Sequence, residues 1–352
     1  MEVSRRSFLT TAAATAAATA IAPLASAADK WGRDRDWTAV TPVTYPEPAW
    51  EIYDKRFTGM QGNSPLKRLW TGSLWAEGPI AMHDWGCVIF SDIPNHRTLR
   101  WCEDDGHVSV FQTNSGFSNG HTRDREGRLI ACEHDTRRVT RLELNGTWTV
   151  LIDRYNGKKL NAPNDAVVAS DGAIWFTDPG YGILGPYEGH KDEFELPTNV
   201  YRLDPQTGKA EVVVDDFRRP NGLCLSPDEK RLYIIDTGAT DGPQYPAHIR
   251  VFDVANGRTL RNGKVFADFK PGFTDGIRAD TDGNLWCSWG WGGPDTNGVR
   301  IHAPNGDKLA MLHLPEIVAN VDFATAKRHY LFMCGSQSIY GVYVNAVGAR
   351  LP

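Results

Sequence analysis

Six oxygen-bearing side chains recur along this sequence, and together they could hold a divalent cation. They are one glutamate, one aspartate and four asparagines: Glu77, Asn119, Asn164, Asn221, Asp275 and Asn320. None offers sulfur or imidazole, and oxygen ligands that include neutral amides favour Ca²⁺, with Mg²⁺ or Mn²⁺ as less favoured alternatives. The sequence holds no His-Glu-x-x-His motif that would indicate zinc. Four of the six precede glycine, and three of these form the Asn-Gly or Asp-Gly pairs that are common in turns, so the chemistry depends on a fold that brings all six together.

Each of these six residues stands ten or eleven positions before the centre of a short apolar run. Every run has a turn, alternating apolar residues and a polar stop, and the six centres are Val88, Leu129, Ile174, Leu232, Leu285 and Tyr330. A repeat of about 40 to 60 residues with several short strands is typical of a β-propeller blade. The sequence therefore predicts an all-β, six-bladed propeller. Because the innermost strands line the central channel, the six polar residues should converge there and form a central metal site.

The two ends of the repeat array predict how the ring is completed. The sixth repeat ends near Val344 without a fourth strand, while run 66–70 lies just where a fourth strand should. We predict that this N-terminal strand completes the sixth blade and closes the ring, because closure removes an exposed strand edge. The propeller would then span residues 66–352. Residues 28–65, which contain Pro42, Pro46 and Pro48, would form an extended N-terminal segment.

The first 27 residues have the features of a twin-arginine signal peptide. Arg5 and Arg6 precede an apolar Ala/Thr stretch, which ends at an Ala-Ser-Ala cleavage site at 25–27. This arrangement predicts export of the precursor by the Tat machinery, and a mature protein that is periplasmic or secreted. No later apolar run approaches the roughly 20 residues of a membrane span, so we expect no membrane anchor in the mature chain. The formal charge of −5 does not indicate the excess of positive charge that is typical of proteins that bind nucleic acid.

Four short motifs around the polar residues carry a family resemblance. They are Trp75-Ala76-Glu77-Gly78-Pro79, Ala162-Pro163-Asn164-Asp165, Arg219-Pro220-Asn221-Gly222-Leu223 and Thr274-Asp275-Gly276-Ile277. In this order they resemble the senescence marker protein/gluconolactonase (luciferin-regenerating-enzyme-like) family, and stretches 118–122 and 175–179 are most similar to its bacterial gluconolactonase branch. The resemblance implies a central metal held by Glu77, Asn164, Asn221 and Asp275. Some members carry a substrate-binding arginine where this chain has Ala162.

The predicted activity is the calcium-dependent hydrolysis of a sugar lactone, a small-molecule substrate. The cation would polarise the lactone carbonyl as a Lewis acid. Asp275 would activate the attacking water as general base, with His121 as an alternative proton carrier. Asn119, Asn164, Asp178 and Tyr181 are the candidates for binding the substrate. The insert 179–197 and the stretch 289–293 should border the mouth of the channel.

Two other functions fit the same residues. The first is a phosphotriesterase or aryl esterase that uses the same metal site, and the second is a non-catalytic periplasmic binding propeller in which calcium only holds the blades.

Two motif matches are interpreted as ordinary loops. The G-x-S-x-G match at 116–120 leads into another β run instead of a helix. The G-x-G-x-x-G match at 180–185 is followed by Pro186, where a phosphate-binding helix should begin.

Overall fold

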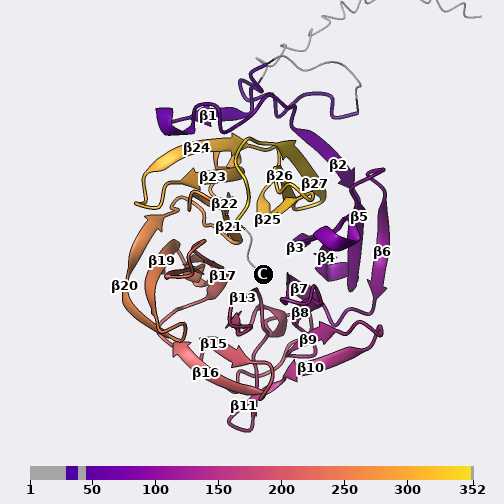
Figure 1. The fold of residues 1–352 in the computed structure, drawn as a ribbon, viewed down its shortest axis with the longest axis vertical. Helices are drawn as coiled ribbons and strands as arrows, with labels where there is room; N and C mark the ends of the chain where they lie inside the picture. The colour runs from indigo at the N-terminus through magenta and orange to yellow at the C-terminus, as the bar shows by residue number, and fades with distance from the viewer. Residues whose placement is uncertain (1–28, 39–44, 350–352) are drawn as a thin grey trace, which may run out of the picture.

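Alternating apolar residues and short turns fold this chain into sheets arranged around a central channel (Figure 1). The computed structural model describes residues 29–38 and 45–349, and the predicted signal peptide at 1–27 lies outside these ranges. Within the described residues, the only helices are short 3-10 turns. Six sheets of four or five strands form the six blades of an all-β propeller, which confirms the predicted fold class.

In the first three blades the strands follow one another in sequence from the channel outward. Blade 1 contains β3 (Ala76–Met82), β4 (Cys87–Asp92), β5 (Arg97–Cys102) and β6 (Val108–Thr113). Blade 2 contains β7 (Ser118–Arg123), β8 (Leu129–Glu133), β9 (Arg138–Leu142) and β10 (Trp148–Ile152). Blade 3 contains β13 (Ala166–Val168), β14 (Ile174–Asp178), β15 (Asn199–Asp204) and β16 (Lys209–Val214). The hairpin of β11 (Arg154–Tyr155) and β12 (Lys158–Lys159) lies between blades 2 and 3 in the sequence.

The last two blades also take strands from the N-terminal part of the chain. Blade 4 contains β17 (Pro220–Leu225), β18 (Arg231–Asp236), β19 (His248–Ala255) and β20 (Thr259–Asp268). Blade 5 contains β21 (Ile277–Ala279), β22 (Leu285–Trp289), β23 (Gly298–His302) and β24 (Lys308–His313), with β1 (Trp50–Ile52) as a fifth strand. Blade 6 contains β25 (Val318–Ala324), β26 (Tyr330–Gly335), β27 (Ser338–Tyr343) and β2 (Lys67–Thr71). The 3-10 turns are η1 (Lys55–Phe57), η2 (His83–Trp85), η3 (Ile93–Asn95), η4 (Tyr181–Ile183), η5 (Gly238–Asp241) and η6 (Pro294–Thr296).

The N-terminal strands lie beside the C-terminal ones at the outer edge of the ring (Figure 1). β2 pairs antiparallel with β27, with Lys67 opposite Gly341. β1 pairs antiparallel with β24, so part of the N-terminal segment forms an ordered strand on blade 5. Antiparallel pairing of this kind satisfies the backbone groups that an outer strand would otherwise expose.

The apolar core lies between neighbouring blades. On β4 the side chains of Val88 and Phe90 are fully buried, and Phe90 packs against Phe332 of blade 6 with ring centroids 5.9 Å apart. Successive inner strands contact one another around the channel, and the last of them, β25, contacts the first, β3. Because all six inner strands are the first strands of their blades, their N-terminal ends meet at one end of the channel.

Candidate active site

A pocket of about 150 Å³ lies where the N-terminal ends of the inner strands meet. Its described lining consists of Trp75, Glu77, Asn119, Asn164, Tyr181, Glu188, Asn221, Thr240, Phe273, Asp275 and Trp291. The four residues predicted to hold a metal are therefore together in one pocket. Three of the four predicted substrate-binding residues, Asn119, Asn164 and Tyr181, line this pocket.

The glycines that follow the polar residues bring neighbouring inner strands close together. Gly120 N–H donates to the Asn164 carbonyl at 2.8 Å, and Gly222 N–H donates to the Asp275 carbonyl at 3.0 Å. A Cβ on Gly120 would lie 2.5 Å from the Asn164 oxygen, and one on Gly222 would lie 2.3 Å from the Asp275 oxygen. Only glycine permits such an approach between two backbones. The ladders of β7 and β17 are irregular here, so these pairs are bulges at which blades touch instead of hairpin turns.

The charges in this pocket lack a cationic partner. Its described lining includes the carboxyl groups of Glu77, Glu188 and Asp275 but no lysine or arginine. Burial raises the pKa of Glu77 well above its ordinary value, and the neighbouring Asp275 carboxylate raises it further. Burial also raises the pKa of Asp275 well above its ordinary value, and Glu188 adds to this increase. Each carboxyl group therefore resists ionisation unless a positive charge joins it.

Carboxylate and amide oxygens in this pocket fit a hard divalent cation. Glu77 and Asp275 supply two negative charges, and Asn164 and Asn221 add amide groups in the same lining. Among the described residues, no three His, Cys, Asp or Glu side chains are grouped as a metal site. A cation here would therefore need the asparagine oxygens to complete its coordination. A bound cation would also offset the repulsion between the buried carboxylates.

Hydroxyl groups on or next to the second strand of a blade hold two of the candidate metal ligands in place. Ser288 Oγ accepts hydrogen bonds from the Asp275 N–H at 3.1 Å and the Gly276 N–H at 2.9 Å. The Asn221 side-chain amide donates to Thr237 Oγ1 at 3.2 Å, which orients its carbonyl end away from that hydroxyl. These contacts come from β22 and from the residue after β18, so neighbouring strands of the same blade position the candidate ligands.

The insert 179–197 contributes two side chains to the pocket. Tyr181, in η4, forms a hydrogen bond of 2.6 Å between its hydroxyl and Thr237 Oγ1. Glu188 lines the pocket from the same insert, and burial raises its pKa to about 7. The insert is anchored on both sides. Arg137 of blade 2 forms an ion pair of 2.6 Å with Asp192, and Arg219 of blade 4 donates to the Pro179 carbonyl at 2.6 Å.

Three of the sequence-predicted residues do not line this pocket. Asn320 of the predicted ring instead accepts the Val321 N–H at its Oδ1 at 2.8 Å. His121 is buried, and its Nδ1 donates to the Gly78 carbonyl at 2.9 Å. Burial lowers the pKa of His121 to about 4, so it is neutral at pH 7. Asp178 is fully buried, accepts the N–H groups of Asn161 at 2.8 Å and Ala162 at 2.6 Å, and has its pKa raised by burial to about 7. His121 thus binds the residue that follows Glu77, and Asp178 binds two residues that shortly precede Asn164.

Several lining residues were absent from the sequence predictions. The rings of Phe273 and Trp291 stack with centroids 4.2 Å apart, and Trp75 lies 5.7 Å from Trp291, which together form an aromatic wall. Trp75 and Phe273 each stand two residues before a predicted carboxylate ligand, and this shared spacing could have identified them. Glu188 and Trp291 lie in the stretches 179–197 and 289–293, which were predicted to border the mouth without naming these side chains. Thr240 lies in a loop with no repeating pattern, so the sequence carried no comparable signal for it.

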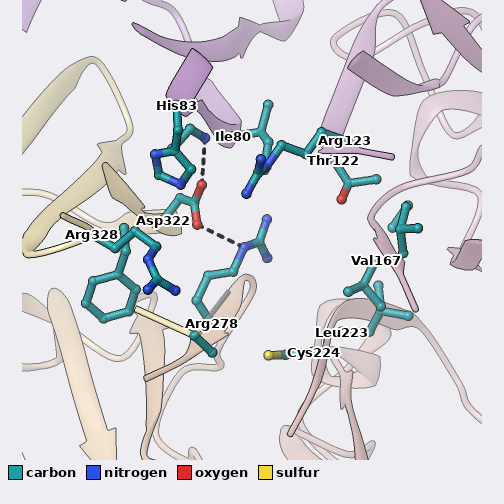
Figure 2. Close-up of a pocket in the computed structure, with 15 residues that line it drawn as sticks. Ile80, His83, Thr122, Arg123, Val167, Leu223, Cys224, Arg278, Asp322 and Arg328 are labelled. Carbon is teal, nitrogen blue, oxygen red and sulfur yellow. Dashed lines mark hydrogen bonds and ion pairs between the residues drawn. The ribbon is translucent and has the colours of Figure 1, made fainter. Parts of the chain in front are cut away.

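The opposite end of the channel holds a smaller pocket of about 50 Å³ (Figure 2). Figure 2 shows Arg278 and Asp322 side by side in it, with Arg278 Nε 3.4 Å from Asp322 Oδ1. Asp322 Oδ2 also accepts the Ala81 N–H at 2.7 Å, and Arg278 lies 3.8 Å from Asp165. None of the predicted metal, substrate or catalytic residues lines this pocket.

A family model for the TAT (twin-arginine translocation) pathway signal sequence matches residues 2–22. This signal indicates twin-arginine export to the periplasm or out of the cell. Among the residues that the structure describes, no helix has the length and apolarity needed to cross a membrane.

A second family model, the SMP-30/gluconolactonase/LRE-like region, matches residues 75–337. The gluconolactonase of Zymomonas mobilis subsp. mobilis is 28% identical over 305 residues, which cover 81% of this chain and 83% of that protein. A solved gluconolactonase structure from Xanthomonas campestris is 34% identical with a TM-score of 0.77, and the match covers 84% of this chain and 94% of that one. The calcium-binding protein regucalcin from Agrobacterium tumefaciens shares the fold, with a TM-score of 0.67, 17% identity, and coverage of 81% and 95%. This chain belongs to the SMP-30/gluconolactonase/LRE-like family.

Proposed function

We propose that this protein is a calcium-dependent hydrolase that opens a sugar lactone. The observation that carries the proposal is the pocket lining, in which three carboxylates and three asparagine amides face an aromatic wall without a lysine or arginine among them. Such a lining suits a bound cation together with a hydroxylated ring that can lie against the aromatic side chains. Relatives named as gluconolactonases support the reaction class.

Glu77, Asn164, Asn221 and Asp275 would hold the cation. Their donors are all oxygen atoms, which favours Ca²⁺ over zinc or other metals that prefer nitrogen and sulfur. When bound, the cation supplies Lewis-acid polarisation of the lactone carbonyl and stabilises the negative charge that develops on it.

Asp275 is the proposed general base. Its carboxylate takes a proton from water as that water attacks the lactone carbonyl carbon. The ring C–O bond then breaks, and the proton passes to the alkoxide that leaves, so that lactone and water become one hydroxy acid. The two hydrogen bonds that Ser288 accepts from the Asp275 and Gly276 N–H groups hold this carboxylate's backbone still during the reaction.

The remaining pocket residues would orient the substrate. Asn119, Asn164 and Tyr181 carry groups that can form hydrogen bonds with sugar hydroxyls, while Phe273 and Trp291 offer flat apolar faces. For His121 and Asp178 the contacts favour structural roles, because each already binds backbone groups outside the pocket.

We also propose that β2 closes the ring. The support is its pairing with β27, which gives blade 6 its fourth strand and joins the N-terminal and C-terminal ends of the propeller. Closure would keep the six inner strands at a constant distance from the axis, as a multi-blade cation site requires.

The test combines a turnover assay with a direct measurement of metal binding. A pH indicator reports acid release from glucono-δ-lactone before chelation, after chelation, and after calcium is restored, while calorimetry measures calcium binding to the wild type and to Asp275→Asn. We expect activity that chelation abolishes and calcium restores, and a variant with weakened calcium binding. Full turnover in protein shown by elemental analysis to be metal-free would refute the metal dependence. Calcium binding without lactone opening would refute the sugar-lactonase function, and turnover of aryl esters or phosphotriesters would then replace it.

A further inference from the structure

One carboxylate in the pocket comes from the insert instead of the inner strands. Glu77 is the second residue of β3 and Asp275 lies two residues before β21, whereas Glu188 lies within the insert 179–197. The Glu188 side chain keeps 24% of its surface exposed, and one of its oxygens lies 3.6 Å from Nδ1 of His134. It is not one of the four proposed metal ligands, so its place in the pocket needs another explanation.

A buried histidine lies next to both Glu188 and Asn119. His134 is fully buried, and its Nε2 lies 3.3 Å from the side-chain amide nitrogen of Asn119. Burial lowers the pKa of His134 to about 4, so its ring is neutral at pH 7. A neutral ring that accepts the Asn119 N–H at Nε2 must carry its own proton at Nδ1. That Nδ1 has no hydrogen-bond partner within normal distance, and a side-chain oxygen of Glu188 lies 3.6 Å from it.

The insert is packed so tightly that Glu188 has a defined position. A Cβ on Gly182 would lie 2.3 Å from the Cβ of His134, so the insert lies directly against this histidine. Nearby, His190 Nδ1 lies 2.6 Å from Asp135 Oδ1, and Asp192 forms its ion pair with Arg137. Glu188 is therefore held next to His134 by contacts on both sides of it in the sequence.

We propose that Glu188 determines substrate specificity by accepting hydrogen bonds from the hydroxyl groups of a polyhydroxylated lactone. This inference rests on the proposed function. Glu188 and Asn119 both line the pocket and both lie next to His134, so neighbouring hydroxyls of one ring can reach both. A carboxylate has two oxygens that can accept from adjacent hydroxyls. A lactone ring without hydroxyls would bury Glu188 unpaired, and this cost selects against it.

The experiment compares two lactones that share a six-membered ring, glucono-δ-lactone and δ-valerolactone, of which only the first carries ring hydroxyls. Both are assayed with wild-type protein, with Glu188→Ala and with the control Glu193→Ala, which removes an exposed glutamate from the same insert. Binding of the matching lactams, gluconolactam and δ-valerolactam, is measured by calorimetry in calcium, because lactams resist hydrolysis. Circular dichroism confirms that each variant is folded.

We expect Glu188→Ala to lower kcat/KM for glucono-δ-lactone and affinity for gluconolactam by about ten- to a hundred-fold, as the loss of a charged hydrogen bond predicts. The values for δ-valerolactone should change less than about twofold, and Glu193→Ala should resemble the wild type on both substrates. Equal losses on both lactones, or no loss of gluconolactam binding, would overturn the inference. If the wild type opens neither lactone but binds gluconolactam through Glu188, the inference stands and the proposed lactonase function fails.

Discussion

Replacing Glu77 by Gln tests whether the pocket is built for a cation. The substitution keeps the size of the side chain and one oxygen but removes one of the three negative charges. Without metal, the folded-state pKa values of Glu77 and Asp275 lie above their ordinary values. The stability linked to these groups is therefore present at low pH and is lost as pH rises through their folded-state pKa values. In chelator at pH 7, Glu77→Gln should unfold at the same temperature as the wild type or higher.

Calcium should reverse this order. A ligand at 100 times its Kd stabilises a folded protein by about 2.7 kcal/mol. A domain of about 300 residues unfolds with an entropy near 0.6 kcal/mol per degree, so the wild-type Tm should rise by about 4 °C. Loss of one charged ligand costs about 1.5 to 3 kcal/mol of binding, which weakens calcium affinity roughly 10- to 100-fold. At the same calcium concentration the variant should gain only about 1 to 2 °C.

Differential scanning calorimetry at pH 5 and pH 7, in chelator and in calcium, measures both effects. Glu193→Gln is the matched control, because Glu193 is exposed on the insert and should respond to calcium as the wild type does. An equal calcium-induced rise in Tm for Glu77→Gln and the wild type would refute the assignment of Glu77 as a ligand. A wild-type Tm that does not respond to calcium at either pH would refute the cation site as a whole.

Three further predictions follow from individual contacts. Gly222→Ala would place a Cβ 2.3 Å from the Asp275 carbonyl oxygen. This clash should lower the stability measured by urea unfolding by about 2 to 3 kcal/mol and weaken calcium binding. In the control Gly185→Ala the added Cβ has no atom within 4 Å, so neither property should change. Arg137→Met removes the ion pair to the insert and should make the insert more susceptible to limited proteolysis, with a stability loss of about 2 kcal/mol; unchanged cleavage would show that this pair does not anchor it. Asp178 has a pKa raised to about 7 from 3.8, so the stability linked to it is present below pH 3.8 and lost by pH 7. The stability of the wild type relative to Asp178→Asn should therefore fall by about 3 kcal/mol between pH 4 and pH 7 in urea titrations, and a constant difference would contradict this.

The glycines of the polar ring show why local patterns were informative but incomplete. Asn-Gly and Asp-Gly pairs are typical of hairpin turns, and the sequence alone could not distinguish a turn from a bulge. In the structure, Gly120 and Gly222 each donate a backbone hydrogen bond to the next blade. The partner in each bond is more than 40 residues away along the chain, so no short-range pattern could reveal it.

His121 and Asp178 show a second limit of prediction from spacing. Both were predicted to lie near the mouth of the channel. In the structure each forms hydrogen bonds with the backbone of another segment instead, His121 with Gly78 and Asp178 with residues 161–162. A polar side chain in a closely packed ring satisfies the nearest unpaired backbone group first, because an unpaired buried group is costly. Which group is nearest depends on the path of the neighbouring loop.

By itself, the sequence determined the number of blades, the all-β fold, the export signal and the residue types that begin each inner strand. The export signal is a single N-terminal segment with its own order of charge and apolar residues. The other properties come from a pattern that recurs in six copies along the chain, and a repeated pattern can be read without knowing which segments touch. The sequence placed the insert 179–197 and the stretch 289–293 at the mouth of the channel, but the tertiary structure alone decided that Glu188, Trp291 and Thr240 are the side chains that join the pocket and that His134 lies next to Asn119. These residues come from loops without a period, and their positions follow from ion pairs and packing between segments far apart in the chain.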